Sequence, residues 1–161
     1  GDDCTVWLNA VVRGDVHFIK IGNRTNIQDN SCLHTLNGKA PVILGDDVTI
    51  GHSVTLHGCV VHDGALIGMG ATVLDHAEVG KGAIVAAGAL VLSNTKIGDG
   101  ELWAGVPAKF IKKVDPVQAA ELNQTYARHY IEYSDWFRNA DADARNTQEV
   151  TTSEDYRAYE D

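Results

Sequence analysis

The sequence is poor in positive charge. Its 161 residues contain 13 lysines and arginines against 22 aspartates and glutamates, a formal net charge of −9 with histidine neutral. Nucleic acids and anionic membranes are bound through clustered lysine and arginine side chains, so this balance argues against both as partners. The excess of acidic residues is unevenly distributed along the chain, because residues 139–161 contain 7 acidic and 2 basic residues and contribute −5 of the −9.

Long apolar runs and paired cysteines are also missing. No apolar run approaches the roughly 20 residues that span a bilayer, and the first residues do not show the basic and then apolar pattern of a secretory signal. The 3 cysteines, Cys4, Cys32 and Cys59, are far apart, and an odd number is a poor basis for a disulfide framework. We therefore expect a single soluble domain in a reducing compartment, the cytoplasm.

Proline is rare, with 3 residues against 16 glycines, so the glycines are not simply loop residues. A repeat explains them better, because aliphatic residues recur every six positions at Val61, Ile67, Val73, Val79, Val85, Val91 and Ile97. A small residue lies two positions before each, and a glycine follows several of them. Earlier blocks with the same period contain Ile21, Ile27 and Leu33, and then Leu44, Ile50 and Leu56.

A period of six fits neither an amphipathic helix nor long alternating strands. It indicates short strands that each end in a turn, with the aliphatic residue pointing inward and glycine relieving the backbone. The pattern resembles the hexapeptide repeat of the left-handed parallel β-helix, in which three hexads, about 18 residues, make one coil. We expect an all-β fold of this class over residues 1–114, with a loop at 35–41 that leaves the stack of coils.

The period ends near Trp103, and a helical pattern begins after it. Asp115 is placed as an N-cap and Pro116 as the first helical residue, and the apolar residues that follow have helical spacing. We expect one α-helix over residues 115–138 that packs on the coils. Residues 139–161 are rich in acids and threonine, which predicts an acidic, mobile tail.

Two histidines occupy equivalent positions of the repeat. His34 and His57 each follow an inward aliphatic residue, and they are 23 positions apart, one coil of about 18 plus 5 extra residues that fit in the loop at 35–41. Stacked one coil apart, the two rings would lie within about 5 Å of each other, close enough for one metal ion. His52 occupies a different position and should project from a neighbouring face or corner, so a neighbouring subunit could supply it instead. Three histidines and one open position are the ligands of a catalytic zinc.

A resemblance to the γ-class carbonic anhydrase family is carried by four segments over residues 5–114, namely VVRGDVHFIKIGNRTNIQDNSCLH, VTIGHSVTLHGCVV, LIGMGATVLDHAEVG and ELWAGVPAKFI. The resemblance implies a homotrimer with metal sites between subunits, where a metal-bound hydroxide hydrates CO2 reversibly to bicarbonate. It assigns His34 and His57 of one chain and His52 of the next as ligands. Zn2+ is the expected metal, with Fe2+ or Co2+ as alternatives, since histidine suits all three.

The resemblance also suggests roles for further residues. Gln28 would hydrogen-bond the hydroxide or bicarbonate, because an amide offers both a donor and an acceptor. Arg13 would pair with carboxylates across the interface, with Asp15 and Asp29 as partners, although these charges could equally form a purely structural network. Tyr130 resembles a tyrosine near the metal, and packing is the alternative for it.

Two features depart from the family pattern. Val16 follows Asp15, and the loop at 35–41 contains no acid or histidine where the best-studied branch has a proton-shuttling glutamate. We therefore expect slow turnover or another relay, through His17, His62 or Tyr130. Family members usually begin one or two coils earlier, so we expect this chain either to lack its first coils or to be a short form.

Two other functions stay open. The same architecture serves coenzyme A-dependent acyltransferases, for which His57, His62 or His76 could be the general base, although a net charge of −9 offers few cations to a phosphorylated cofactor. The protein could also be a metal-binding scaffold that keeps the ligands without efficient turnover. A carbonic anhydrase-like lyase is the leading interpretation.

Overall fold

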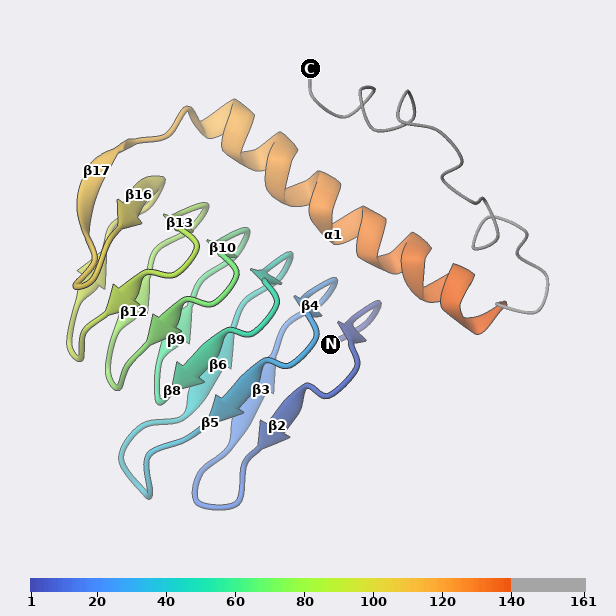
Figure 1. Cartoon of the computed structure of the whole chain (residues 1–161), viewed down its shortest axis with the longest axis horizontal. Helices are drawn as coiled ribbons and strands as arrows, with labels where there is room; N and C mark the ends of the chain where they lie inside the picture. The colour runs from blue at the N-terminus through green and yellow to red at the C-terminus, as the bar shows by residue number, and fades with distance from the viewer. Residues whose placement is uncertain (140–161) are drawn as a thin grey trace, which may run out of the picture. The chain divides into compact units, whose positions relative to one another are not determined.

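The computed structural model describes residues 1–139, and residues 1–131 form one compact unit built on parallel coils (Figure 1). Each coil gives one short strand to each of three sheets. The first sheet has the order β1-β4-β7-β10-β13-β16-β17, with bounds Thr5–Val6, Asn26–Ile27, Thr49–Ile50, Leu66–Ile67, Ile84–Val85, Glu101–Ala104 and Lys109–Lys113. The second has the order β14-β11-β8-β5-β2, with bounds Leu90–Val91, Thr72–Val73, Thr55–His57, Cys32–His34 and Val11–Arg13. The third has the order β15-β12-β9-β6-β3, with bounds Lys96–Ile97, Glu78–Val79, Val60–Val61, Val42–Leu44 and Ile19–Ile21.

The repeat fixes the register between coils. Where the hexads are regular, paired residues are 18 positions apart, as Thr72 and Leu90 are. His34 pairs with His57, 23 positions later, because a turn closed by a bridge between Leu36 and Ala40 is inserted between them. All strand pairs are parallel except β16 with β17.

The repeated aliphatic residues form the core. Along the second sheet, the side chains that point inward are fully buried one above another at Leu33, Leu56, Val73 and Val91. Burying one such side chain contributes about 1.5–3 kcal/mol, and no coil could bury this column without its neighbours. The predicted fold class, a parallel β-helix of hexapeptide repeats with one C-terminal helix, is confirmed.

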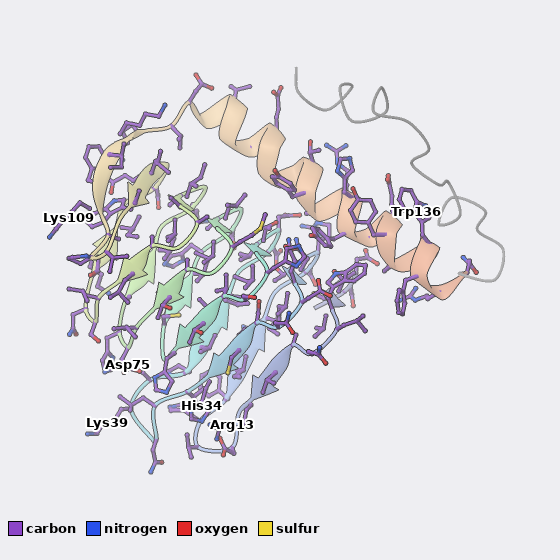
Figure 2. The ribbon with its side chains drawn as sticks, viewed as in Figure 1. Arg13, His34, Lys39, Asp75, Lys109 and Trp136 are labelled. Carbon is purple, nitrogen blue, oxygen red and sulfur yellow. The ribbon has the colours of Figure 1, made fainter. Side chains whose placement is uncertain are left out.

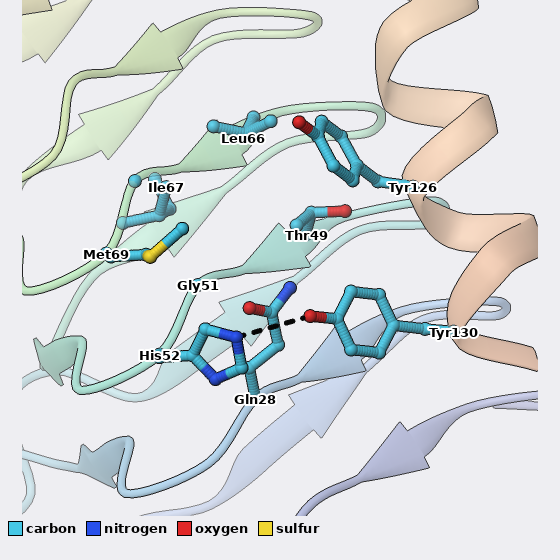
Figure 3. Close-up of a pocket in the computed structure, with 10 residues that line it drawn as sticks. Gln28, Thr49, Gly51, His52, Leu66, Ile67, Met69, Tyr126 and Tyr130 are labelled. Carbon is cyan, nitrogen blue, oxygen red and sulfur yellow. Dashed lines mark hydrogen bonds between the residues drawn. The ribbon is translucent and has the colours of Figure 1, made fainter. Parts of the chain in front are cut away.

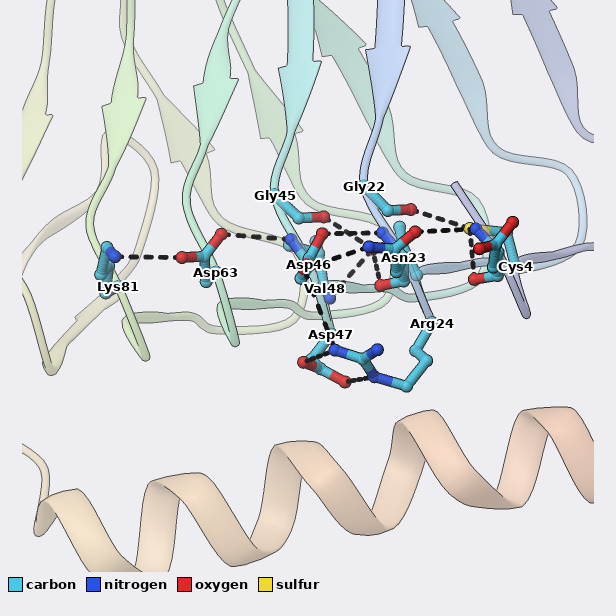
Figure 4. Close-up of polar contacts among 12 residues, drawn as sticks. Cys4, Gly22, Asn23, Arg24, Gly45, Asp46, Asp47, Val48, Asp63 and Lys81 are labelled. Carbon is cyan, nitrogen blue, oxygen red and sulfur yellow. Dashed lines mark hydrogen bonds and ion pairs between the residues drawn. The ribbon is translucent and has the colours of Figure 1, made fainter.

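Polar side chains tie the coils together at one corner. Asp46 Oδ1 accepts a hydrogen bond from the Asn23 backbone N–H at 2.8 Å, and Asp63 Oδ1 accepts one from Asp46 N–H at 3.2 Å (Figure 4). Beside this row, both Asp47 oxygens accept hydrogen bonds from the Arg24 guanidinium, at 2.6 and 2.7 Å. The bonds to Asn23 N–H and Asp46 N–H satisfy backbone donors that the turns leave outside the sheets.

The helix α1 (Pro116–Arg138) follows β17. Asp115 Oδ1 accepts a hydrogen bond from Val117 N–H at 2.9 Å, which is the geometry of an N-cap. Ala127 is buried, and the Tyr130 ring meets the Trp7 ring edge to face with centroids 5.4 Å apart, so this part of the helix packs on the first coils. A second unit begins at Glu132, and apart from Asn139 the predicted acidic tail lies outside the described residues. Among residues 1–139, no helix is long and apolar enough to cross a membrane.

Candidate metal centre

The eight predicted site residues fall into two groups on different parts of the coil. We call the first group, on the second sheet and the turns beside it, the paired-histidine half-site; its predicted members are Arg13, Asp15, His34 and His57. We call the second group, beside the first sheet and helix α1, the pocket half-site; its members are Gln28, Asp29, His52 and Tyr130.

The paired-histidine half-site is built by the register of three neighbouring strands. Arg13 on β2, His34 on β5 and His57 on β8 occupy equivalent positions, so their side chains leave the same face one coil apart. The Nδ1 atom of His34 lies 3.1 Å from Nε2 of His57, and the ring centroids are 5.1 Å apart. Two nitrogen ligands of one tetrahedral zinc ion are about 3.3 Å apart, since each Zn–N bond is about 2.0–2.1 Å. The pair therefore fits a single metal ion.

Carboxylates contact the outer nitrogen of each of these two rings. Asp15 Oδ1 lies 3.1 Å from His34 Nε2, while Asp15 Oδ2 accepts a hydrogen bond from Arg13 Nη1 at 2.6 Å. The Arg13 guanidinium holds the pKa of the Asp15 carboxyl below its usual range. Asp75 Oδ1 lies 2.6 Å from His57 Nδ1. The His34 and His57 side chains are 20% and 31% exposed, so both rings are mostly buried but not closed off from solvent.

The pocket half-site surrounds His52, which lies in the turn after β7. His52 Nδ1 is 2.9 Å from Asp29 Oδ2, and its Nε2 is 3.4 Å from the Tyr130 hydroxyl (Figure 3). An apolar wall of Leu66, Ile67 and Met69 completes this pocket. With Gln28, the half-site thus combines one histidine, three polar side chains and an apolar surface.

A buried amide row positions Gln28 in the same pocket. Gln28 Nε2 donates to Asn26 Oδ1 at 3.1 Å, and Asn26 Nδ2 donates to Thr49 Oγ1 at 2.9 Å. All three side chains are buried, at 4% exposure or less. Within residues 1–139, the Gln28 side-chain oxygen has no hydrogen-bond partner, so it remains available to a ligand in the pocket.

The structure joins some predicted partners and separates others. Arg13 pairs with Asp15, whereas Asp29 pairs with His52 in the other half-site. His34 and His57 meet, but His52 lies in the turn after β7, and no three His, Cys, Asp or Glu side chains among residues 1–139 converge as a metal site. Two residues were missed from the sequence, Asn26 and Asp75. Asp75 lies one position beyond the residue that stacks on His57, because Leu56 pairs with Val73, 17 positions later.

The fold and its repeats show that this is a hexapeptide-repeat protein. The family described as "Bacterial transferase hexapeptide (six repeats)" matches residues 58–93. A hexapeptide transferase family protein of Anaplasma phagocytophilum has the same fold, with a TM-score of 0.77 and 40% identity over 83% of this chain and 77% of that chain. The carbonic anhydrase of Geobacillus kaustophilus is 49% identical over 138 residues, 86% of this chain and 75% of its own length. The chain belongs to the γ-class carbonic anhydrase family.

Relatives from Arabidopsis thaliana are considerably longer. Mitochondrial gamma carbonic anhydrase 1 is 50% identical over 130 residues, which are 78% of this chain and 47% of the relative. The match to gamma carbonic anhydrase 2 likewise covers 49% of that protein, so this chain spans about half the length of these two relatives. Family membership implies a metal cofactor, and the facing nitrogens of His34 and His57 fit one.

Proposed function

We propose that this protein is a metal-dependent carbonic anhydrase that hydrates CO2 reversibly to bicarbonate at sites between the subunits of a homotrimer. The observation that carries the proposal is the separation of 3.1 Å between His34 Nδ1 and His57 Nε2, two nitrogens placed for one metal ion. The γ carbonic anhydrase relatives support it independently.

A ring of three subunits supplies what each half-site lacks. Head-to-tail interfaces in a closed ring join two different surfaces of the same chain. Here the paired-histidine half-site of one subunit meets the pocket half-site of the next, so that His52 adds the third imidazole to His34 and His57. Zn2+ is the proposed metal, with Fe2+ or Co2+ able to replace it.

The bound metal supplies a Lewis acid that lowers the pKa of a water ligand toward neutrality. Asp29 bonds His52 at Nδ1, so Nε2, which is hydrogen-bonded to the Tyr130 hydroxyl at 3.4 Å in the single chain, would carry the lone pair for the ion. Gln28, held by Asn26, offers its free amide oxygen and so orients water or bicarbonate. The apolar wall of the pocket suits CO2, which carries no charge.

The proton must leave without an acidic shuttle in the loop at 35–41. Of the relay candidates, His62 lies after β9 on the third sheet and is bonded to Glu78 at 2.7 Å, so it belongs to neither half-site. Tyr130 does lie beside His52. We therefore expect slow turnover that increases with buffer concentration.

The test compares metal content and CO2 hydration in trimer purified without a histidine tag under reducing, anaerobic conditions. Wild type should hold about one metal ion per chain, and His57→Ala should lose both the metal and the activity. His62→Ala is the matched control, because it removes a carboxylate-bonded histidine outside both half-sites. An intact trimer that takes up no metal, even on reloading, would refute the proposal. Metal uptake without hydration would make the protein a metal-binding scaffold.

A further inference from the structure

Asp75 lies in the corner between β11 and β12, one coil beyond His57, along the same side of the stack as His34 and Arg13 (Figure 2). Its Oδ1 is 2.6 Å from His57 Nδ1. Within residues 1–139, this is the only side chain to which the Asp75 carboxylate is hydrogen-bonded. The carboxylate therefore serves the histidine rather than a larger ion-pair network.

The backbone holds this corner in place from both sides. His76 N–H donates to the Gly58 carbonyl at 2.7 Å, and Asn94 N–H donates to the Asp75 carbonyl at 3.0 Å. Gly58 is left-handed, with φ of 57°, and a Cβ on it would lie 2.5 Å from Asp75 Oδ1. The residue next to His57 thus has no side chain where the carboxylate needs the space.

A neutral imidazole carries one N–H and one lone pair, and the partner of one nitrogen decides which atom carries the proton. A carboxylate at Nδ1 keeps the proton there and leaves the lone pair on Nε2, the atom that faces His34. We infer that Asp75 is a positioning residue that fixes the tautomer and ring orientation of His57 for metal binding. This inference rests on the proposed function.

The test measures Zn2+ affinity of the full-length trimer by competition with a chromophoric chelator, in wild type, Asp75→Ala and Asp75→Asn. Loss of an outer carboxylate partner weakens metal binding by about 10- to 100-fold, and we expect this for Asp75→Ala. Asp75→Asn keeps the shape and an acceptor oxygen but not the charge, so its Zn2+ affinity should fall by about 10-fold, the lower end of this range. Glu78→Gln is the matched control, because Glu78 bonds His62 at 2.7 Å on another sheet, and its affinity should equal that of wild type.

Two further readouts separate positioning from stability. The metal-free trimers of wild type and Asp75→Asn should unfold at the same temperature, whereas the visible absorption of the Co2+-loaded variant should shift because His57 is less well oriented. Equal Zn2+ affinity in wild type and Asp75→Ala would overturn the role of Asp75 and leave the proposed function standing. If Asp75→Ala does not assemble, equal Zn2+ affinity in wild type and Asp75→Asn would overturn that role instead. A wild-type trimer that binds no metal would overturn the proposed function and this inference with it.

Discussion

The proposed trimer predicts that two inactive variants, His52→Ala and His57→Ala, restore each other's metal sites and activity when they share one assembly. His52→Ala leaves the paired-histidine half-site intact, and His57→Ala leaves the pocket half-site intact. His52 lies in the turn after β7 and His57 lies on β8 of the second sheet, so each substitution damages one half-site without touching the other. Each homotrimer should lack functional metal sites, because every interface contains one damaged half.

The expected recovery follows from counting interfaces. A site in the mixed trimer is intact only when the His52→Ala chain supplies His34 and His57 and the His57→Ala chain supplies His52. Every trimer that contains both variants, in either ratio, has one such interface among its three, so about one third of the wild-type sites should return in the mixed trimers. Each mixed trimer then carries a single working site.

The assay co-expresses the two variants with different affinity tags and purifies the trimers that carry both. Metal per chain and the initial rate of CO2 hydration are measured against wild type and each homotrimer. Both quantities should recover together. Mixed trimers that remain empty and inactive, while wild type binds metal, would show that one chain supplies all three histidines and would refute the shared site.

Three further predictions concern individual residues. Gln28→Leu should keep the metal but lower kcat/KM for CO2 hydration by about 100-fold, as loss of one preorganised hydrogen-bonding group does; unchanged kinetics would remove Gln28 from the mechanism. Leu56→Ala should lower the free energy of unfolding by about 2–5 kcal/mol in urea titrations at fixed protein concentration, because the side chain is fully buried and its neighbours on two coils cannot close the cavity. Burial raises the pKa of the Cys59 thiol from 9.0 to about 12, so iodoacetamide at pH 8.5 should modify it only after unfolding. The same shift makes the protonated thiol stabilise the fold below pH 9, and this contribution should decline as pH rises toward 12, where mass spectrometry of the native protein should first detect labelling.

The stack of coils could be predicted from the sequence because its information is local and periodic. Each hexad repeats the same inward aliphatic residue, so the core column and the stacking of His34 on His57 follow from counting positions. The largest insertion, the turn at 35–41, was visible as a break in the period. Counting placed two of the proposed ligands on one face and the third elsewhere.

Hydrogen-bond partners could not be obtained in this way. Whether Arg13 bonds Asp15 or Asp29 depends on side-chain torsions and on which turn approaches which strand, and in one chain it bonds Asp15. Asn26 is two residues before Gln28, yet only the packing of the first sheet shows that its amide holds Gln28 in the pocket. Asp75 is one position beyond the equivalent of His57, so only the geometry of the corner between β11 and β12 brings its carboxylate to that ring.

The sequence by itself determined the fold class, the coil register and the equivalence of His34 and His57, because a short repeat leaves only one way to bury its aliphatic residues. The tertiary structure decided which atoms face each other. In the structure, His34 Nδ1 lies 3.1 Å from His57 Nε2, and a carboxylate contacts the other nitrogen of each ring. His52 lies with Tyr130 in a separate pocket. Such contacts are made or lost when the distance between residues of different coils changes by a few tenths of an ångström. No periodicity in the sequence encodes differences of that size.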